Sequence, residues 1–126
     1  MPRLLLLPLV FLAGCGAASA PAILEPPKQV RGGWTLASAA TPTETFPLAI
    51  QPAQSWRTTY SGPQDVAADF YRFNSNTEAF EVLQKWKKAP GEITFHDGSF
   101  LVVIPPQNVP EQATGDFVEG VMAAIN

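Results

Sequence analysis

The sequence predicts an α+β fold: an antiparallel sheet of four to five strands, with two amphipathic helices packed on one face. Three observations support this fold class. Apolar and polar side chains alternate with the period of a strand in residues 56–60 and 66–73. Apolar side chains recur at helical spacing in residues 76–88 and 110–125. The pair Asp97-Gly98 separates two β-rich runs, which indicates a hairpin.

The first strand is predicted at Gly33-Trp34-Thr35-Leu36, where the ordered part of the chain is expected to begin. Residues 37–54 contain three prolines and are expected to be mostly loop. Within this loop the apolar side chains alternate and are expected to cover an edge of the sheet; they are Phe46, Leu48 and Ile50.

The next two strands, residues 56–60 and 66–73, are predicted to pair across the turn at Ser61-Gly62-Pro63-Gln64. In the second of them one face is wholly apolar and is assigned to the core: Val66, Ala68 and Phe70. The opposite face carries Ala67, Asp69 and Tyr71. The sequence has many large aromatic rings for a domain of this size, and most of the following five are expected in the core: Trp34, Trp56, Tyr60, Tyr71 and Trp86.

The first helix should begin at Ser75, because Ser75 and Glu78 have the spacing of a capping box. Its apolar stripe consists of Ala79, Val82, Leu83 and Trp86. Three lysines are placed in the last turn, where cations suit the helix dipole: Lys85, Lys87 and Lys88. They indicate either contact with anionic lipid headgroups or, more simply, a solvated helix end.

The hairpin formed by residues 93–95 and 100–104 is predicted to turn at Asp97-Gly98 with positive φ at both residues, as in a type I′ turn. Pro110 suits the first turn of a second helix. That helix buries a stripe that includes Phe117, Val121 and Ile125. Gly115 and Gly120 each weaken it by about 1 kcal/mol relative to alanine, so tertiary packing has to hold it.

The N-terminus has the features of a secretory signal, since Arg3 precedes an apolar run of residues 4–12 that is too short to span a bilayer. The run ends in Leu12-Ala13-Gly14-Cys15, which resembles the lipobox of bacterial lipoproteins at all four positions. That resemblance implies a diacylglyceryl group on the Cys15 sulfur, cleavage before Cys15 and acylation of the new amino terminus. The expected division is a signal peptide at 1–14, a lipidated Pro/Ala-rich tether at 15–33 and one domain at 34–126.

Two other fates of the N-terminus remain open. An ordinary secretory signal could be cut after Ala18 or Ala20, and the apolar start could instead be retained in the cytoplasm. Gly16 stands where some lipoproteins carry the aspartate of inner-membrane retention. By the same resemblance, a two-membrane organism would send the protein to the periplasmic side of its outer membrane.

The rest of the chain is loosely similar to small uncharacterised domains of bacterial lipoproteins. The features that carry this likeness are the Gly33-Trp34 start, the aromatic hairpin, the capped helix, the glycine hairpin and the C-terminal helix. The likeness implies no activity.

Composition argues against several kinds of chemistry. The formal charge is −3 and becomes about −4 without Arg3 (7 basic against 11 acidic residues), which disfavours nucleic-acid binding. Cys15 is the only cysteine, so an acylated chain keeps no thiol for a disulfide or a metal. We expect no cofactor, because the sequence has no glycine-rich phosphate motif, and no catalytic or metal-binding residues.

Two sets of residues remain as candidates for function. The outer face of the sheet is predicted to present Arg57, Thr59, Asp69 and Tyr71, a flat surface suited to an envelope protein or a glycan. His96 could move a proton or bind a metal, although a hairpin tip favours polar residues for its own reasons. The leading hypothesis is a non-enzymatic binding or assembly module, anchored to membrane lipid through Cys15. The alternatives are a small envelope enzyme or substrate-binding accessory using Asp69, Tyr71 or His96, and a purely structural lipoprotein.

Overall fold

The computed structural model describes residues 23–125, which form six strands and two helices. In chain order the elements are β1 (Gln29–Val30), β2 (Trp34–Ala40), β3 (Gln54–Ser61), β4 (Val66–Arg72), α1 (Asn76–Lys85), β5 (Ile93–Asp97), β6 (Phe100–Ile104) and α2 (Glu111–Ile125). The α+β class is therefore confirmed.

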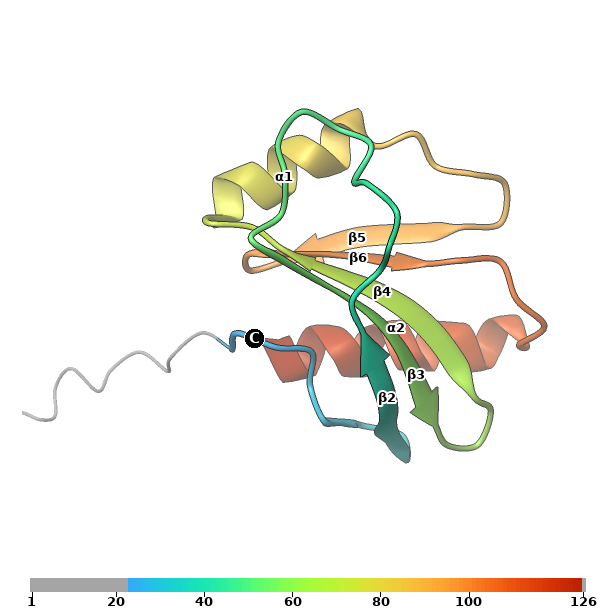
Figure 1. The fold of residues 1–126 in the computed structure, drawn as a ribbon. Coiled ribbons are helices and arrows are strands. Elements are labelled where there is room, and N and C mark those ends of the chain that lie inside the picture. Colours follow the sequence, from blue (N-terminus) through green and yellow to red (C-terminus); the bar gives the residue numbers. More distant parts are fainter. Residues whose placement is uncertain (1–22, 126) are drawn as a thin grey trace, which may run out of the picture.

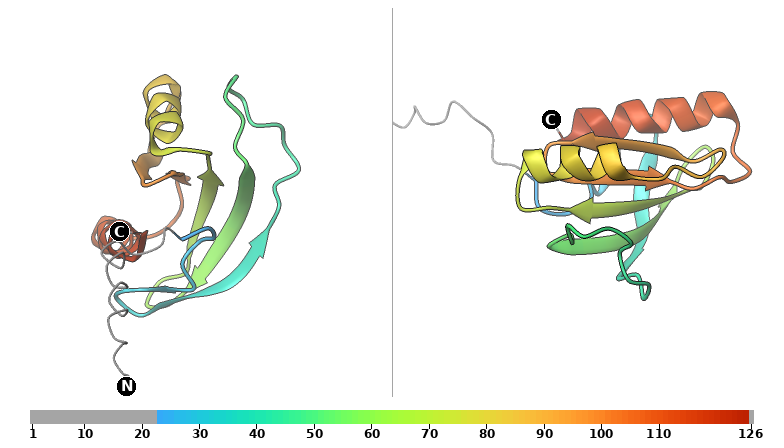
Figure 2. Two further views of the ribbon diagram at one scale, coloured as in Figure 1. Left: turned by 90° about the vertical axis from the view of Figure 1, so that its left-hand side faces the viewer. Right: turned by 90° about the horizontal axis from the view of Figure 1, so that it is seen from above.

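The strands of the described region build one antiparallel sheet in the order β1-β2-β3-β4-β6-β5, which curls around α2 (Figure 2). The sequence predicted four to five strands. The short β1 is an addition, and β2 continues to Ala40 into residues expected to be loop. The small side chains of Ala37-Ser38-Ala39-Ala40 carry no contrast between an apolar and a polar face, so the strand period is invisible there.

The main core lies between α2 and the face of the sheet that curls around it. Phe117 and Val121 of α2 are fully buried there. They pack against side chains that alternate along the strands, including Tyr60 of β3, Phe70 of β4 and Val102 of β6. The predicted apolar face of β4 is confirmed, since Val66, Ala68 and Phe70 are all buried.

Helix α1 packs on the opposite face of the sheet, which corrects the prediction that both helices share one face (Figures 1 and 2). There Ala79 and Val82 of α1 meet Leu101 and Val103 of β6. Strand β6 is an unbroken apolar run whose five residues are all buried. Such a run is typical of a strand covered on both sides, and it needs one helix for each face.

The segment before β2 is packed as well. Val30 is buried, Ile23 packs against the main core, and the Tyr60 hydroxyl donates a 2.7 Å hydrogen bond to the Pro27 carbonyl oxygen. Residues 23–33 were expected to belong to the tether, yet they include β1 and contact the core. The predictions for the signal peptide, Cys15 and the first part of the tether lie outside the described residues.

Two local predictions change in detail. The hairpin turns at Gly98-Ser99, and φ is positive at Gly98 (+57°) but not at Asp97, so the predicted type I′ geometry is wrong. Helix α1 begins as predicted, with the Ser75 hydroxyl accepting from the Glu78 N–H at 3.1 Å. It ends at Lys85, however, so Lys87 and Lys88 lie beyond its last turn.

Neither helix of residues 23–125 combines the length and the apolar character needed to cross a bilayer.

Candidate functional site

The outer-face residues predicted on β3 and β4 share one face of the sheet, opposite the side that packs on α2. Arg57 stands directly across from Asp69, and Tyr71 stands across from Ser55. Alternation along both strands places the neighbours of these residues in the core, because successive side chains of a strand point to opposite faces. The prediction that Arg57, Thr59 and Asp69 share a face with Tyr71 agrees with this register.

Arg57 is held between two carboxylates. Its Nε donates to Asp69 Oδ1 at 3.2 Å, and its Nη1 donates to Glu44 Oε2 at 3.0 Å. Asp69 is the less exposed partner, with a side chain 16% exposed against 61% for Glu44. These hydrogen bonds raise the pKa of Arg57, with the bond to Asp69 contributing most. The pKa of Glu44 is lowered, first by its own backbone N–H and then by Arg57.

Tyr71 forms the aromatic part of the site. Its ring lies 4.9 Å from that of Phe46 and 6.3 Å from that of Trp86, measured between centroids. Burial, and secondarily the negative charge of Asp69, raises the pKa of Tyr71 to about 12. The hydroxyl is therefore protonated at neutral pH and offers one donor and an acceptor to any ligand.

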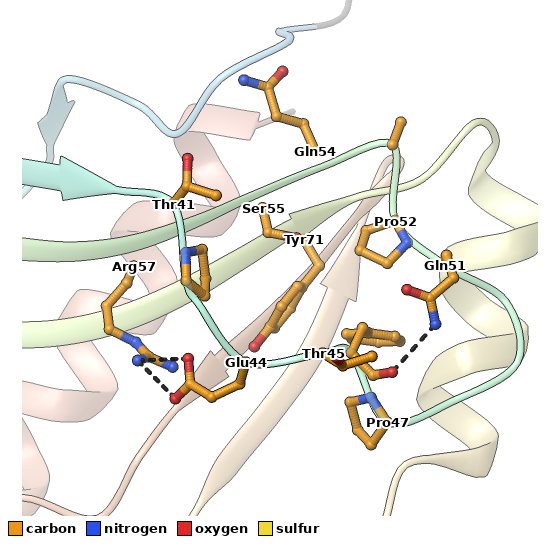
Figure 3. A pocket seen from close by; sticks show the side chains of 13 residues that line it. Thr41, Glu44, Thr45, Pro47, Gln51, Pro52, Gln54, Ser55, Arg57 and Tyr71 are labelled. Carbon is orange, nitrogen blue, oxygen red and sulfur yellow. Dashed lines mark hydrogen bonds and ion pairs between the residues drawn. The ribbon is translucent and has the colours of Figure 1, made fainter.

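Residues 41–53 bend over this part of the sheet and, together with it, line an open pocket of about 550 Å³ (Figure 3). Arg57 and Tyr71 line it from the sheet, and Glu44 and Phe46 line it from the loop that forms its outer wall. The amide of Gln51 fixes the loop by donating to the Leu48 carbonyl oxygen at 2.7 Å. The remaining lining mixes proline rings with hydroxyl and amide groups, including Pro42, Pro52, Thr41, Thr45, Gln54 and Ser55.

The structure brings three of the four predicted surface residues together. Arg57 and Tyr71 line the pocket, and Asp69 contacts it through Arg57. Thr59 is exposed beside Ala67, further along the sheet, and does not belong to the lining of this pocket. The face is thus partly covered: α1 shields β5 and β6, the loop shields Tyr71, and the part around Arg57 and Thr59 is open.

His96 lies apart from this pocket. The register places Tyr71 opposite Leu101 and Leu101 opposite His96, so the fully buried Leu101 separates the two rings. The His96 ring instead packs against the Phe80 ring of α1, with 5.4 Å between the ring centroids. Its Nδ1 is buried without a hydrogen-bond partner. Asp69, Tyr71 and His96 therefore do not converge on one point. Within residues 23–125, no group of three or more His, Cys, Asp and Glu side chains is placed to hold a metal ion.

Two contributors to the pocket were not identified as site residues in advance. Glu44 comes from a segment without regular structure, and nothing in its local pattern places it beside Arg57. Phe46 carried a signal, because its alternation with Leu48 and Ile50 predicted that these side chains cover an edge of the sheet, whereas Phe46 lies over Tyr71 of the central strand β4. In the structure these three side chains do pack with the α1 core.

Searches against protein-family models, curated proteins and solved structures find no match to this chain. The fold and site together define an α+β domain with a partly covered sheet and an open polar-aromatic pocket on its outer face.

Proposed function

We propose that this protein is a lipid-anchored lipoprotein of the bacterial cell envelope that acts as a non-enzymatic binding module. The observation that carries the anchor is the sequence Leu12-Ala13-Gly14-Cys15 directly after the apolar run. Two or three acyl chains at Cys15 would hold the domain permanently at the bilayer, because each buried CH₂ contributes about 0.8 kcal/mol.

The pocket of residues 41–57 and Tyr71 is the proposed binding site, for an envelope protein or a glycan. It is concave and open, and it combines one aromatic ring with hydroxyl, amide and charged groups, which is the composition expected of a specific recognition site. Arg57 is already bound by Glu44 and Asp69, so the cluster carries a net negative charge. A partner that presents hydroxyl, amide or cationic groups suits it better than an anion.

The anchor is tested by labelling cells with a clickable fatty acid. The wild-type protein should carry the label and Cys15→Ala should not. A matched variant, Ala18→Leu/Ala20→Leu, removes the small residues that an ordinary signal peptidase would need but leaves the lipobox intact. It should be labelled like the wild type. A mature amino terminus at Ser19 or Pro21 would show that the chain is secreted without an anchor.

The binding site is tested with a photo-crosslinking amino acid placed at Gln54, which lines the pocket, or at Gln112, an exposed glutamine of α2. Crosslinking in intact cells should yield a defined adduct from Gln54 and none from Gln112. Purified cell-wall glycan, offered to the same two variants, separates a glycan from a protein partner. Equal capture at both positions, or no adduct at either, would favour a purely structural lipoprotein.

A further inference from the structure

The end of the domain where the chain enters carries an exposed apolar surface. Two large hydrophobic side chains of residues 23–125 are exposed. They are Leu24, which is 62% exposed, and Phe80, which is 47% exposed. A groove of about 450 Å³ adjoins Leu24, lined by Ile23, Leu24, Pro26, Pro27 and Ala124 together with Glu25 and Lys28. The N-terminal segment, blue in Figure 1, lies beside the C-terminal end of α2, and the groove takes its lining from both.

The N-terminal segment is fixed to the domain. Ile23 packs against the main core, Pro26 is buried, and the Pro27 carbonyl accepts from Tyr60 at 2.7 Å. The chain therefore leaves the domain at Ile23 at a defined place, next to Ala124.

Seven residues, 16–22, separate Ile23 from Cys15. The covalent chain from Cys15 to Ile23 can span at most about 27 Å. A domain of about 100 residues is roughly 30 Å across, given its radius of gyration of about 13 Å. Even at its greatest reach the connection is therefore shorter than the domain is wide, and the entry end stays on the bilayer side.

Resting on the proposed lipid anchor at Cys15, we propose that this end of the domain lies against the lipid surface, with Leu24 in the bilayer interface. The charges there fit a lipid surface, because Glu25 and Lys28 balance each other although the whole domain is acidic. Insertion therefore depends on apolar contact and on the short connection, with no need for anionic lipid.

This orientation turns the three lysines at the C-terminal end of α1 away from the membrane: Lys85, Lys87 and Lys88. Lys88 lies beside Glu111, at the start of α2, whereas Leu24 lies beside Ala124, near its end. Thirteen helical steps lead from Glu111 to Ala124, so the two places are about 20 Å apart. The lysines then belong to a solvated end rather than to a headgroup-binding patch.

The test uses the full lipidated protein in phosphatidylcholine vesicles, with a single cysteine introduced for a fluorescent label. Because Cys15 is acylated, the label reaches only the new position. The variants are Leu24→Cys, Phe80→Cys, a control for exposed apolar sites, and Lys88→Cys, a control for the far end. A lipid-borne nitroxide should quench the label at position 24 several-fold more than at 80 or 88. Aqueous iodide should give the reverse order.

The other outcomes overturn the proposal in distinguishable ways. Equal lipid quenching at all three positions in protein that floats with the vesicles would mean that the domain turns freely on its anchor. A label at position 24 shielded from both quenchers would mean that residues 16–22 of this chain fill the groove instead of lipid. Protein that does not float would refute the anchor itself, and the orientation with it.

Discussion

The Tyr60 hydroxyl and the Pro27 carbonyl oxygen, 33 positions apart in sequence, are joined by a 2.7 Å hydrogen bond. Tyr60 is fully buried in the main core, and Pro27 lies in the segment that precedes β1. This one bond ties the entry segment to the middle of the sheet. Together with the packing of Ile23 and Val30, it holds the N-terminal residues in place before the first long strand begins.

Replacing Tyr60 with phenylalanine should lower the free energy of unfolding by about 1 kcal/mol, because the Pro27 carbonyl loses its donor while the ring stays in place. Urea denaturation measures the change. Tyr71→Phe is the matched control, since its hydroxyl faces the open pocket where water can replace it. Equal losses in the two variants would show that the bond to Pro27 contributes nothing specific.

Stability should also fall at alkaline pH because of the same tyrosines. Burial raises the pKa of Tyr60 above its ordinary value of 10.0 and raises the pKa of Tyr71 to about 12. A raised tyrosine pKa means that the folded state favours the neutral phenol. The contribution of these neutral phenols to the free energy of unfolding is therefore complete below pH 10. It is lost as the pH rises through the pKa values that the tyrosines have in the folded state. Phenolate absorbance should appear only above pH 10, and Tyr71→Phe should remove the component near pH 12.

The sequence was informative where side chains contrast strongly. In β3 and β4 the alternation of large apolar and polar residues predicted which side chains are buried, and with them the shared face of Arg57, Asp69 and Tyr71. The Ser75 cap was equally readable, because capping is a local interaction. Both predictions depend on residues a few positions apart.

The parts that were missed have two causes. Strand β1 pairs with the nearby Thr35 and Trp34 of β2, but its two residues are too few to show the period of a strand. The other two depend on distant residues. The placement of α1 could not be read from its own stripe, because an apolar stripe does not say which face of β6 it covers. Glu44 reaches Arg57 only because residues 41–53 fold back over the sheet.

The two glycines of α2 should respond in opposite ways to alanine. A Cβ at Gly120 would lie 2.6 Å from Val30 Cγ1 and 2.7 Å from the Arg31 carbonyl oxygen, so β1 would have to move. A Cβ at Gly115 meets nothing within 4 Å. We expect Gly115→Ala to raise the free energy of unfolding by up to about 1 kcal/mol through helix propensity. Gly120→Ala should lower it by about 1–3 kcal/mol through overpacking.

Thermal and urea unfolding of the two variants check this prediction, with each serving as the control for the other. If Gly120→Ala were stabilising, the close contact between α2 and the segment at Val30 would not exist in solution. The predicted pattern also explains how a helix with two glycines is held. Gly120 lets the segment at Val30 and Arg31 approach α2 closely, whereas Gly115 is exposed and has no such contact.

Two interactions connect the loop over the proposed pocket to the rest of the domain, and they differ in magnitude. Phe46 is 8% exposed, and its ring lies 4.9 Å from Tyr71, 5.7 Å from Trp86 and 5.8 Å from Phe73. Burial of one phenylalanine contributes up to about 3 kcal/mol. The ion pair of Glu44 with Arg57 is exposed on both sides, and such pairs contribute little because water screens them. The ring should therefore hold the loop, and the ion pair should not.

Phe46→Ala should lower the free energy of unfolding by about 3 kcal/mol, the lower end for a buried phenylalanine, because the loop can partly settle into the space. Glu44→Gln should leave it almost unchanged. Phe46→Leu is the control that keeps an apolar side chain at this position, and it should lower the free energy of unfolding much less than Phe46→Ala. Proteolysis within residues 41–53 should accelerate strongly in Phe46→Ala alone, because that variant releases the outer wall of the pocket while the sheet stays folded. Equal acceleration in Glu44→Gln would mean that charge, and not burial of the ring, closes the loop over Tyr71.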